Sequence, residues 1–154
     1  MKSVLFVMDE GIGNCVLALP AINAIREAGY DVSVMGKYPS LELIPEGIRA
    51  YTLDEIADKV FDFILLSAFS NSYISRYGIN PPTGKSVMYQ SDAIDGVTHE
   101  SLVHFSLAAC LENVNSPERL QDLKLPDIPT QEMDLPDNYI VFANTAAPGW
   151  DHKR

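Results

Sequence analysis

The sequence has little of what several classes of protein require. Only 2 of its 154 residues are cysteine, too few for a disulfide framework, and nothing stands at zinc-ligand spacing. No apolar run approaches the roughly 18 residues that a membrane-spanning helix needs. The N-terminus carries one lysine and then a five-residue apolar run, which is shorter than the apolar core of a signal peptide. We therefore expect a cytoplasmic protein.

Basic residues are also scarce. The chain carries 11 Lys and Arg against 21 Asp and Glu, which gives a formal net charge of −10. A surface of this sign repels the phosphates of nucleic acids and of anionic lipid head groups. We therefore expect no nucleic-acid partner, and the same balance argues against a highly anionic lipid-sugar acceptor.

One stretch organises the remainder of the chain. Residues 4–8 are apolar or β-branched, which is typical of a buried central strand. The turn DEGIGN follows, and from Val16 apolar residues recur at helical spacing until Gly29, which is typical of the position after a helix end. Ligands of open α/β sheets bind outside the carboxyl ends of the strands. Residues 9–14 are therefore the first place to expect a ligand.

Further strands and helices alternate along the chain, which predicts an α/β protein with a doubly wound parallel sheet. The clearest later helix covers residues 99–112, with Thr98 as its N-cap. We expect strands at residues 31–35, 48–53, 61–66 and 85–89, and short helices at residues 40–44 and 54–59.

Proline interrupts the chain after the last predicted helix. Four prolines fall between residues 113 and 138, which indicates a linker. A β-prone segment, YIVFA at residues 139–143, follows, with eleven residues behind it. We therefore expect a first domain over residues 1–137, which includes the linker region 113–138, and the truncated start of a second α/β domain over residues 138–154.

The glycine turn only partly matches a dinucleotide-binding fingerprint. Gly11 and Gly13 stand where its first two glycines would, but Val16 occupies the third position and no acidic residue ends the strand at residues 31–35. A phosphate-binding GxxxxGK[ST] loop is absent as well, because Ile79 stands where its first glycine would. A nucleotide-dependent oxidoreductase domain is thus a minor alternative.

The same stretch carries a resemblance to a known family. The heptosyltransferases of glycosyltransferase family 9 open similarly, with a strand, a Gly-Asp pair and an apolar helix whose proline lies six residues after the acid. Gly13, Asn14 and Pro20 hold that spacing here. Later segments resemble the same family in the same order, and the last of them resembles the start of its nucleotide-sugar domain: FDFILLSAFSNSYIS, KSVMY, HESLVHFSLAACL and YIVFANTAAPGWDHKR.

The resemblance implies the N-terminal half of a GT-B fold, in which two Rossmann-like domains face each other across a cleft. The first domain would bind a sugar or glycolipid acceptor, and the second a nucleotide-sugar donor such as ADP-heptose. Transfer of heptose or a related sugar, in lipopolysaccharide biosynthesis, would be inverting and would need no metal or other cofactor. The longer parent chain would be the enzyme, and this chain alone would be inactive.

The sequence departs from the family at one position that matters for catalysis. The family's base is the Asp of the Gly-Asp pair, and here Asn14 replaces it; an amide is no general base near neutral pH. Either Asn14 orients the acceptor while Asp9 or Glu10 takes the proton, or transfer proceeds without a strong base, or the domain is a sugar-binding or interaction module without catalysis. Asn14 is also a good helix N-cap, a structural role compatible with each alternative.

Other candidate acceptor-binding residues follow from strand ends and from the resemblance. Ser67, Ser70 and Asn71 come after the strand at residues 61–66, where polar side chains either contact hydroxyl groups of a sugar or belong to an ordinary loop. Gly13 belongs to the glycine turn, and His99 opens a helix, where it either faces the cleft or is a solvated histidine at the helix start.

The remaining candidates are weaker. Thr145 and Lys153 match, by position after the last strand, family residues that contact the donor's phosphates, where a lysine would neutralise the leaving diphosphate. Cys15 and Cys110 are expected to be buried thiols, although a thiolate at a helix N-terminus would be stabilised at Cys15. His104 is expected to be structural.

The segment at residues 139–143 generates a first prediction. An apolar, β-prone strand without neighbours tends to pair with another chain, so we expect some dimerisation through YIVFA. Removing everything after Asn138 should give a monomer with an almost unchanged melting temperature, as measured by analytical ultracentrifugation and thermal unfolding. A large fall in melting temperature would instead place this strand in the core of the first domain.

Overall fold

The computed structural model describes residues 1–8, 11–37, 40–56, 58–67, 84–89, 99–115, 117 and 122–127. The predicted strand at residues 139–143 and the predicted start of a second domain lie outside these residues. The elements along the chain are β1 (Ser3–Val7), α1 (Ile12–Glu27), β2 (Asp31–Met35), the 3-10 helix η1 (Ser40–Leu43), β3 (Arg49–Tyr51), α2 (Leu53–Ile56), β4 (Phe61–Leu66), β5 (Gly84–Tyr89) and α4 (Glu100–Ala108).

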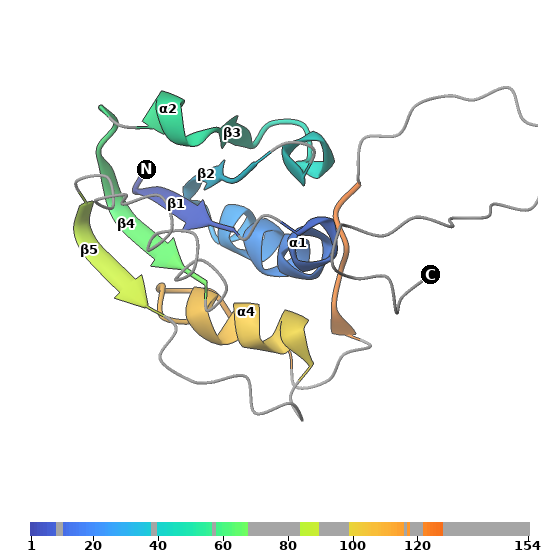
Figure 1. Cartoon of the computed structure of the whole chain (residues 1–154). Coiled ribbons are helices and arrows are strands. Elements are labelled where there is room, and N and C mark those ends of the chain that lie inside the picture. Colours follow the sequence, from blue (N-terminus) through green and yellow to red (C-terminus); the bar gives the residue numbers. More distant parts are fainter. Residues whose placement is uncertain are drawn as a thin grey trace, which may run out of the picture.

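Five strands form one parallel sheet in the order β3-β2-β1-β4-β5 (Figure 1). On one side of β1, Val4 pairs with Val32 of β2, and on the other side it pairs with Phe63 of β4. The order of the strands therefore reverses at β1, because the chain adds strands first on one side of it and then on the other. The expectation of an α/β protein with a parallel sheet is confirmed.

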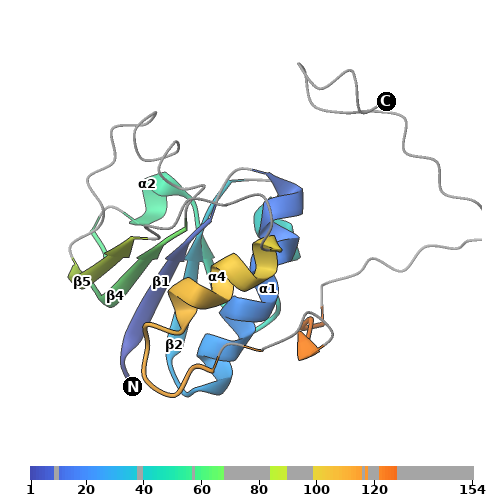
Figure 2. The same cartoon turned by 90° about the horizontal axis from the view of Figure 1, so that it is seen from below.

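Different elements bury the two faces of the sheet. Along β1, Val4 and Phe6 belong to a core shared with α1 and α4, whereas Leu5 and Val7 join Ile56 of α2 in a second core. Figure 2 shows α1 and α4 side by side on one face. This burial explains the uninterrupted apolar sequence of β1, because a central strand of a covered parallel sheet has no side that faces solvent.

The first helix begins earlier than the apolar pattern predicts. Gly11 is the N-cap of α1, so Gly13 and Asn14 lie in the first turn, and the expectation that Asn14 caps the helix is wrong. Apolar spacing marks the residues of a helix that face the core, and the exposed start of α1 carries no such signal. The helix ends as predicted, because Gly29 adopts φ = 90°, a left-handed conformation that glycine accepts without strain.

The later elements follow the sequence pattern with shifted ends. β2 and β4 have their predicted bounds, whereas the helix predicted over residues 99–112 stops at Ala108. Its N-cap is His99 and not Thr98, because Nδ1 of His99 accepts a hydrogen bond from the Ser101 N–H at 3.3 Å. Cys110 lies beyond the helix end and is exposed, so the expectation of a buried thiol there is wrong.

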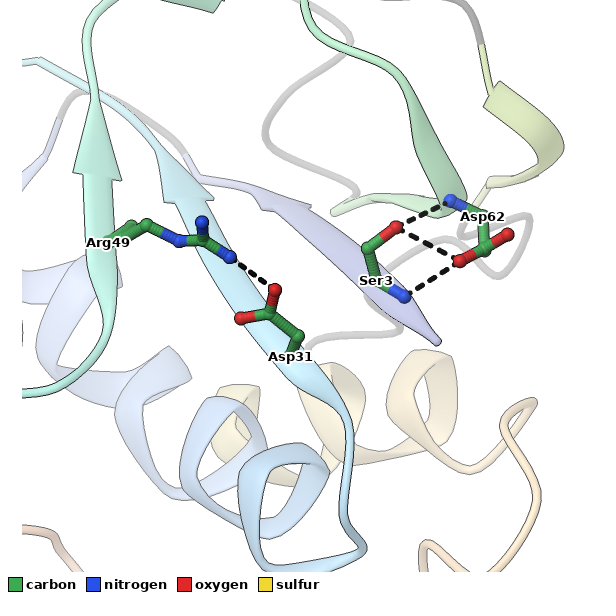
Figure 3. A network of polar contacts seen from close by, with 4 residues as sticks. All are labelled: Ser3, Asp31, Arg49 and Asp62. Carbon is green, nitrogen blue, oxygen red and sulfur yellow. Dashed lines mark hydrogen bonds and ion pairs between the residues drawn. The ribbon is translucent and has the colours of Figure 1, made fainter. Parts of the chain in front are cut away.

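Two polar contacts tie neighbouring strands together near their amino ends (Figure 3). Between β1 and β4, Oδ2 of Asp62 accepts from the Ser3 N–H at 2.9 Å and from the Ser3 hydroxyl at 3.0 Å, and the Asp62 N–H donates back to Ser3 Oγ at 3.0 Å. Between β2 and β3, Arg49 forms an exposed ion pair with Asp31. The mutual hydrogen bonds of Ser3 and Asp62 continue the pairing of β1 with β4 beyond Val4 and so hold the register of the two strands.

Replacing Asp62 with alanine should lower the free energy of unfolding by about 1–3 kcal/mol, because two half-buried donors of Ser3 lose a charged acceptor. Asp31→Ala removes the same charge from an exposed ion pair and should cost less than about 1 kcal/mol. Urea unfolding of the two variants measures the difference. If both variants lost the same unfolding free energy, the hydrogen bonds between Asp62 and Ser3 would not hold β1 against β4.

Candidate functional site

The carboxyl ends of β1 and β4 lie next to each other where the strand order reverses. Ser67, directly after β4, donates its N–H to the Val7 carbonyl at 3.4 Å, and Met8, directly after β1, donates its N–H to the Met35 carbonyl at 3.0 Å. Both chain segments thus leave the sheet at one edge, where ligands of open parallel sheets bind. We call the ends of β1 and β4 together with the first turn of α1 the carboxyl-edge site.

Asn14 lies in this first turn of α1 and is half-buried. Its side chain folds back toward the start of the helix, because a Cβ placed on Gly11 would lie 3.6 Å from Asn14 Nδ2. Gly13 is exposed, and a Cβ there would meet nothing within 4 Å. The edge therefore offers an amide and accessible backbone, with no acidic side chain in the first turn of the helix. An amide donates and accepts hydrogen bonds but does not take a proton near neutral pH.

Cys15 anchors the same turn to its surroundings. The side chain is fully buried, as expected, and Sγ donates to the carbonyl of Ser40 in η1 at 3.4 Å. Burial raises the pKa of the Cys15 thiol to about 11, so the thiol stays protonated at neutral pH. Because the thiolate is the reactive form, Cys15 is a structural contact between α1 and η1 and not a nucleophile.

Of the acceptor-binding residues predicted after β4, the structure describes Ser67. It is 1% exposed, whereas Gly13 is exposed and Asn14 half-buried. Gly13 and Asn14 are therefore better placed than Ser67 to meet a ligand that arrives from solvent. The other predicted residues of this edge and of the donor site lie outside the described residues: Asp9, Glu10, Ser70, Asn71, Thr145 and Lys153.

His99 lies beside a cavity on the flank of α1. It is exposed, and it lines a cavity of about 320 Å³ together with Val16, Leu17 and Pro20 of α1. Asn14 is not among the described residues that line this cavity. The structure therefore divides the predicted acceptor-binding residues that it describes between the carboxyl-edge site and the cavity.

Sequence reasoning missed two parts of this cavity. Ser101 of α4 lines it, and so do Leu123 and Leu125, which lie in the region predicted to be a linker. A signal was present, because apolar and charged residues alternate in the sequence DLKLPD at residues 122–127, which is typical of an extended segment with two sides. In the structure Asp122 and Lys124 line a second cavity, of about 230 Å³.

His104 is the buried titratable residue of α4. Only 2% of it is exposed, and its ring packs edge-on against Phe6 of β1 with the ring centroids 6.0 Å apart. Nε2 lies 3.7 Å from Oε1 of Glu100, one turn earlier on the helix. Burial lowers the pKa of His104 to about 4, so the ring is neutral at pH 7. This agrees with the structural role that the sequence suggested.

The described part of the chain contains no group of three or more His, Cys, Asp and Glu side chains that could hold a metal ion. Within the same residues, no helix has the length and hydropathy to cross a bilayer. Comparison with models of protein families, with curated proteins and with solved structures finds no match.

The burial of His104 predicts a loss of stability in acid. The pKa of His104 is about 4 in the folded chain, below the usual 6.5, so below about pH 6.5 the unfolded chain binds a proton that the folded chain does not. The contribution of His104 to the free energy of unfolding should be constant above about pH 6.5. As the pH is lowered to about 4, this contribution should fall by at most about 3 kcal/mol. His104→Leu should remove this part of the pH dependence, as measured by urea unfolding.

Ser106→Ala is the matched control, because it changes an exposed position of the same helix and removes no titratable group. This variant should keep the acid dependence of the unmodified chain. If His104→Leu left the dependence unchanged, the loss of stability would belong to carboxyl groups, of which Glu100 is next to the ring.

Proposed function

We propose that this chain is the acceptor-binding domain of an inverting glycosyltransferase with two Rossmann-like domains in a GT-B arrangement. The enzyme would transfer heptose or a related sugar from a nucleotide-sugar to a glycan or lipopolysaccharide acceptor. The observation that carries the proposal is the placement of Asn14 on the first turn of the helix after β1, at the edge where the strand order reverses. Heptosyltransferases hold their acid at the corresponding sequence position, and open α/β sheets bind ligands at this edge.

The strand order supports the same proposal. The order β3-β2-β1-β4-β5 is that of the first five strands of a Rossmann-type sheet. In a GT-B enzyme one such domain presents its carboxyl edge to the cleft, where the acceptor lies. The exposed Gly13 and the amide of Asn14 are then the groups that hydrogen-bond the acceptor.

The proposed reaction is a direct displacement. An acceptor hydroxyl oxygen forms a bond to the anomeric carbon of the donor sugar, while the bond from that carbon to the diphosphate oxygen breaks and its electron pair leaves with the diphosphate. The proton of the hydroxyl passes to the carboxylate of Asp9 or Glu10, which follow β1 in the sequence, because the amide of Asn14 does not accept it. Asn14 orients the acceptor by hydrogen bonds.

Two other functions compete with this one. A sugar-binding or interaction module without catalysis would use the same edge and would differ only in having no base. An oxidoreductase domain is less well supported, because Val16 replaces the third glycine of the fingerprint. The strand β2 is followed by Gly36 and Lys37, not by the acidic residue that would bind a ribose.

Substitutions of Asn14 test the proposal in the two-domain parent enzyme. Asn14→Asp should keep or raise sugar transfer and add an acidic limb to the pH profile, because a carboxylate acts as a base. Asn14→Ala should lower transfer about tenfold to a hundredfold through the loss of a hydrogen bond to the acceptor. Its free energy of unfolding should not carry the cost of a lost helix cap, because Gly11 and not Asn14 is the N-cap of α1.

The release of nucleoside diphosphate measures transfer, and Asn115→Ala, at an exposed asparagine beyond α4, is the control. If Asn14→Ala left transfer unchanged while substitution of Asp9 or Glu10 abolished it, Asn14 would have no role. Low-micromolar binding of ADP to this chain alone, measured by calorimetry, would contradict its assignment to the acceptor side. Sugar binding without transfer in the parent chain would favour the module without catalysis.

A further inference from the structure

The cavity between α1 and α4 is not used by the proposed function. Its volume of about 320 Å³ lies at the lower end of the range in which proteins bind small molecules, about 300–1,000 Å³. Its described lining is apolar except at the start of α4, which supplies both polar residues. The apolar residues are Val16, Leu17, Pro20, Leu123 and Leu125, and the polar ones are His99 and Ser101.

Ser101 gives the polar end of the cavity an unused hydrogen-bonding group. It is 3% exposed although it lines the cavity. Its backbone N–H donates to His99 Nδ1 at 3.3 Å, but among the described residues its hydroxyl makes no hydrogen bond. The hydroxyl is not among the described polar atoms that are sealed from solvent, so a ligand atom in the cavity can reach it and supply a hydrogen-bond partner.

The contact with Ser101 also sets the chemistry of His99. Because Nδ1 accepts the Ser101 N–H, the neutral ring carries its proton on Nε2 and is a donor there. The polar end therefore combines one imidazole donor with one hydroxyl that both donates and accepts. Such a pair is complementary to the hydroxyl groups of an uncharged head group.

The remainder of the cavity suits an aliphatic chain. Leu17 is half-buried, and Leu125 is 61% exposed although it lines the cavity, so the apolar wall is only partly covered. No Asp, Glu, Lys or Arg is among the described lining residues. The net charge of −10 disfavours an anionic ligand. A cationic ligand would find no carboxylate among the described lining residues to pair with, so an uncharged ligand fits best.

We propose that this cavity binds an uncharged amphiphile. An unbranched aliphatic chain lies against Leu17 and Leu125, and a hydroxyl-bearing head group contacts Ser101 and His99. The proposal goes beyond the function assigned to the carboxyl-edge site. Binding to this chain is measured without any sugar transfer, so the two proposals fail independently.

The probe is n-octyl β-D-glucoside, kept below its micelle concentration and added to the whole chain, with amide signals followed by NMR. The changes in amide chemical shift should saturate as octyl glucoside is added, and the largest changes should belong to the residues that line the cavity. Ser101→Ala should weaken binding about threefold to tenfold through the loss of one hydrogen bond, and Leu17→Trp should abolish binding by filling the cavity. Ser106→Ala is the matched control, because it removes the same atom from an exposed position of α4 that does not line the cavity.

Two further probes test the two halves of the ligand. Glucose supplies the head group without the chain and should not bind at the cavity, and octanoate, with its charged head group, should bind more weakly than octyl glucoside. Tighter binding of octanoate or equal binding of glucose would overturn the proposal. The proposal would also be overturned if the chemical-shift changes were confined to other exposed apolar residues, such as Ile12 and Val60. Equal affinities of the unmodified chain and its Ser101→Ala and Leu17→Trp variants would overturn it too.

Discussion

The burial of β1 on both of its faces is the constraint on which the other elements depend. Residues 4–8 are at most 1% exposed, so their backbone groups need hydrogen-bond partners within the protein. β2 and β4 supply those partners, while α1 and α4 cover one face and Ile56 of α2 packs on the other. Because the strand order reverses at β1, the strand that forms the centre of the core also ends at the edge where a ligand is expected.

The first turn of α1 keeps its place at this edge through contacts with its neighbours, because no side chain caps the helix. The buried thiol of Cys15 ties it to Ser40. Nearby, a Cβ on Gly36 would approach side-chain atoms of Leu41 at 3.1 Å and of Met8 at 3.2 Å, so the segments after β1 and β2 approach closely. The position of Asn14 therefore depends on packing around the ends of three elements.

Pro20 connects the packing of α1 to both cavities. It is buried in the middle of the helix and has no N–H, so α1 lacks the hydrogen bond to the Val16 carbonyl. The same proline lines the cavity beside His99 and the cavity beside Lys124.

The sequence by itself determined the features whose signals are local. Apolar runs and alternation predicted β2 and β4 at their observed bounds, Gly29 marked the end of α1, and the order strand, turn, helix put Asn14 at the carboxyl edge. Only the tertiary structure decided that α1 starts at Ile12, that His99 caps α4 beside a cavity that Asn14 does not line, and that Leu123 lines the same cavity. A cap depends on backbone angles and on which side chain reaches an N–H, and a cavity depends on contacts between segments far apart in the chain, so local periodicity encodes neither.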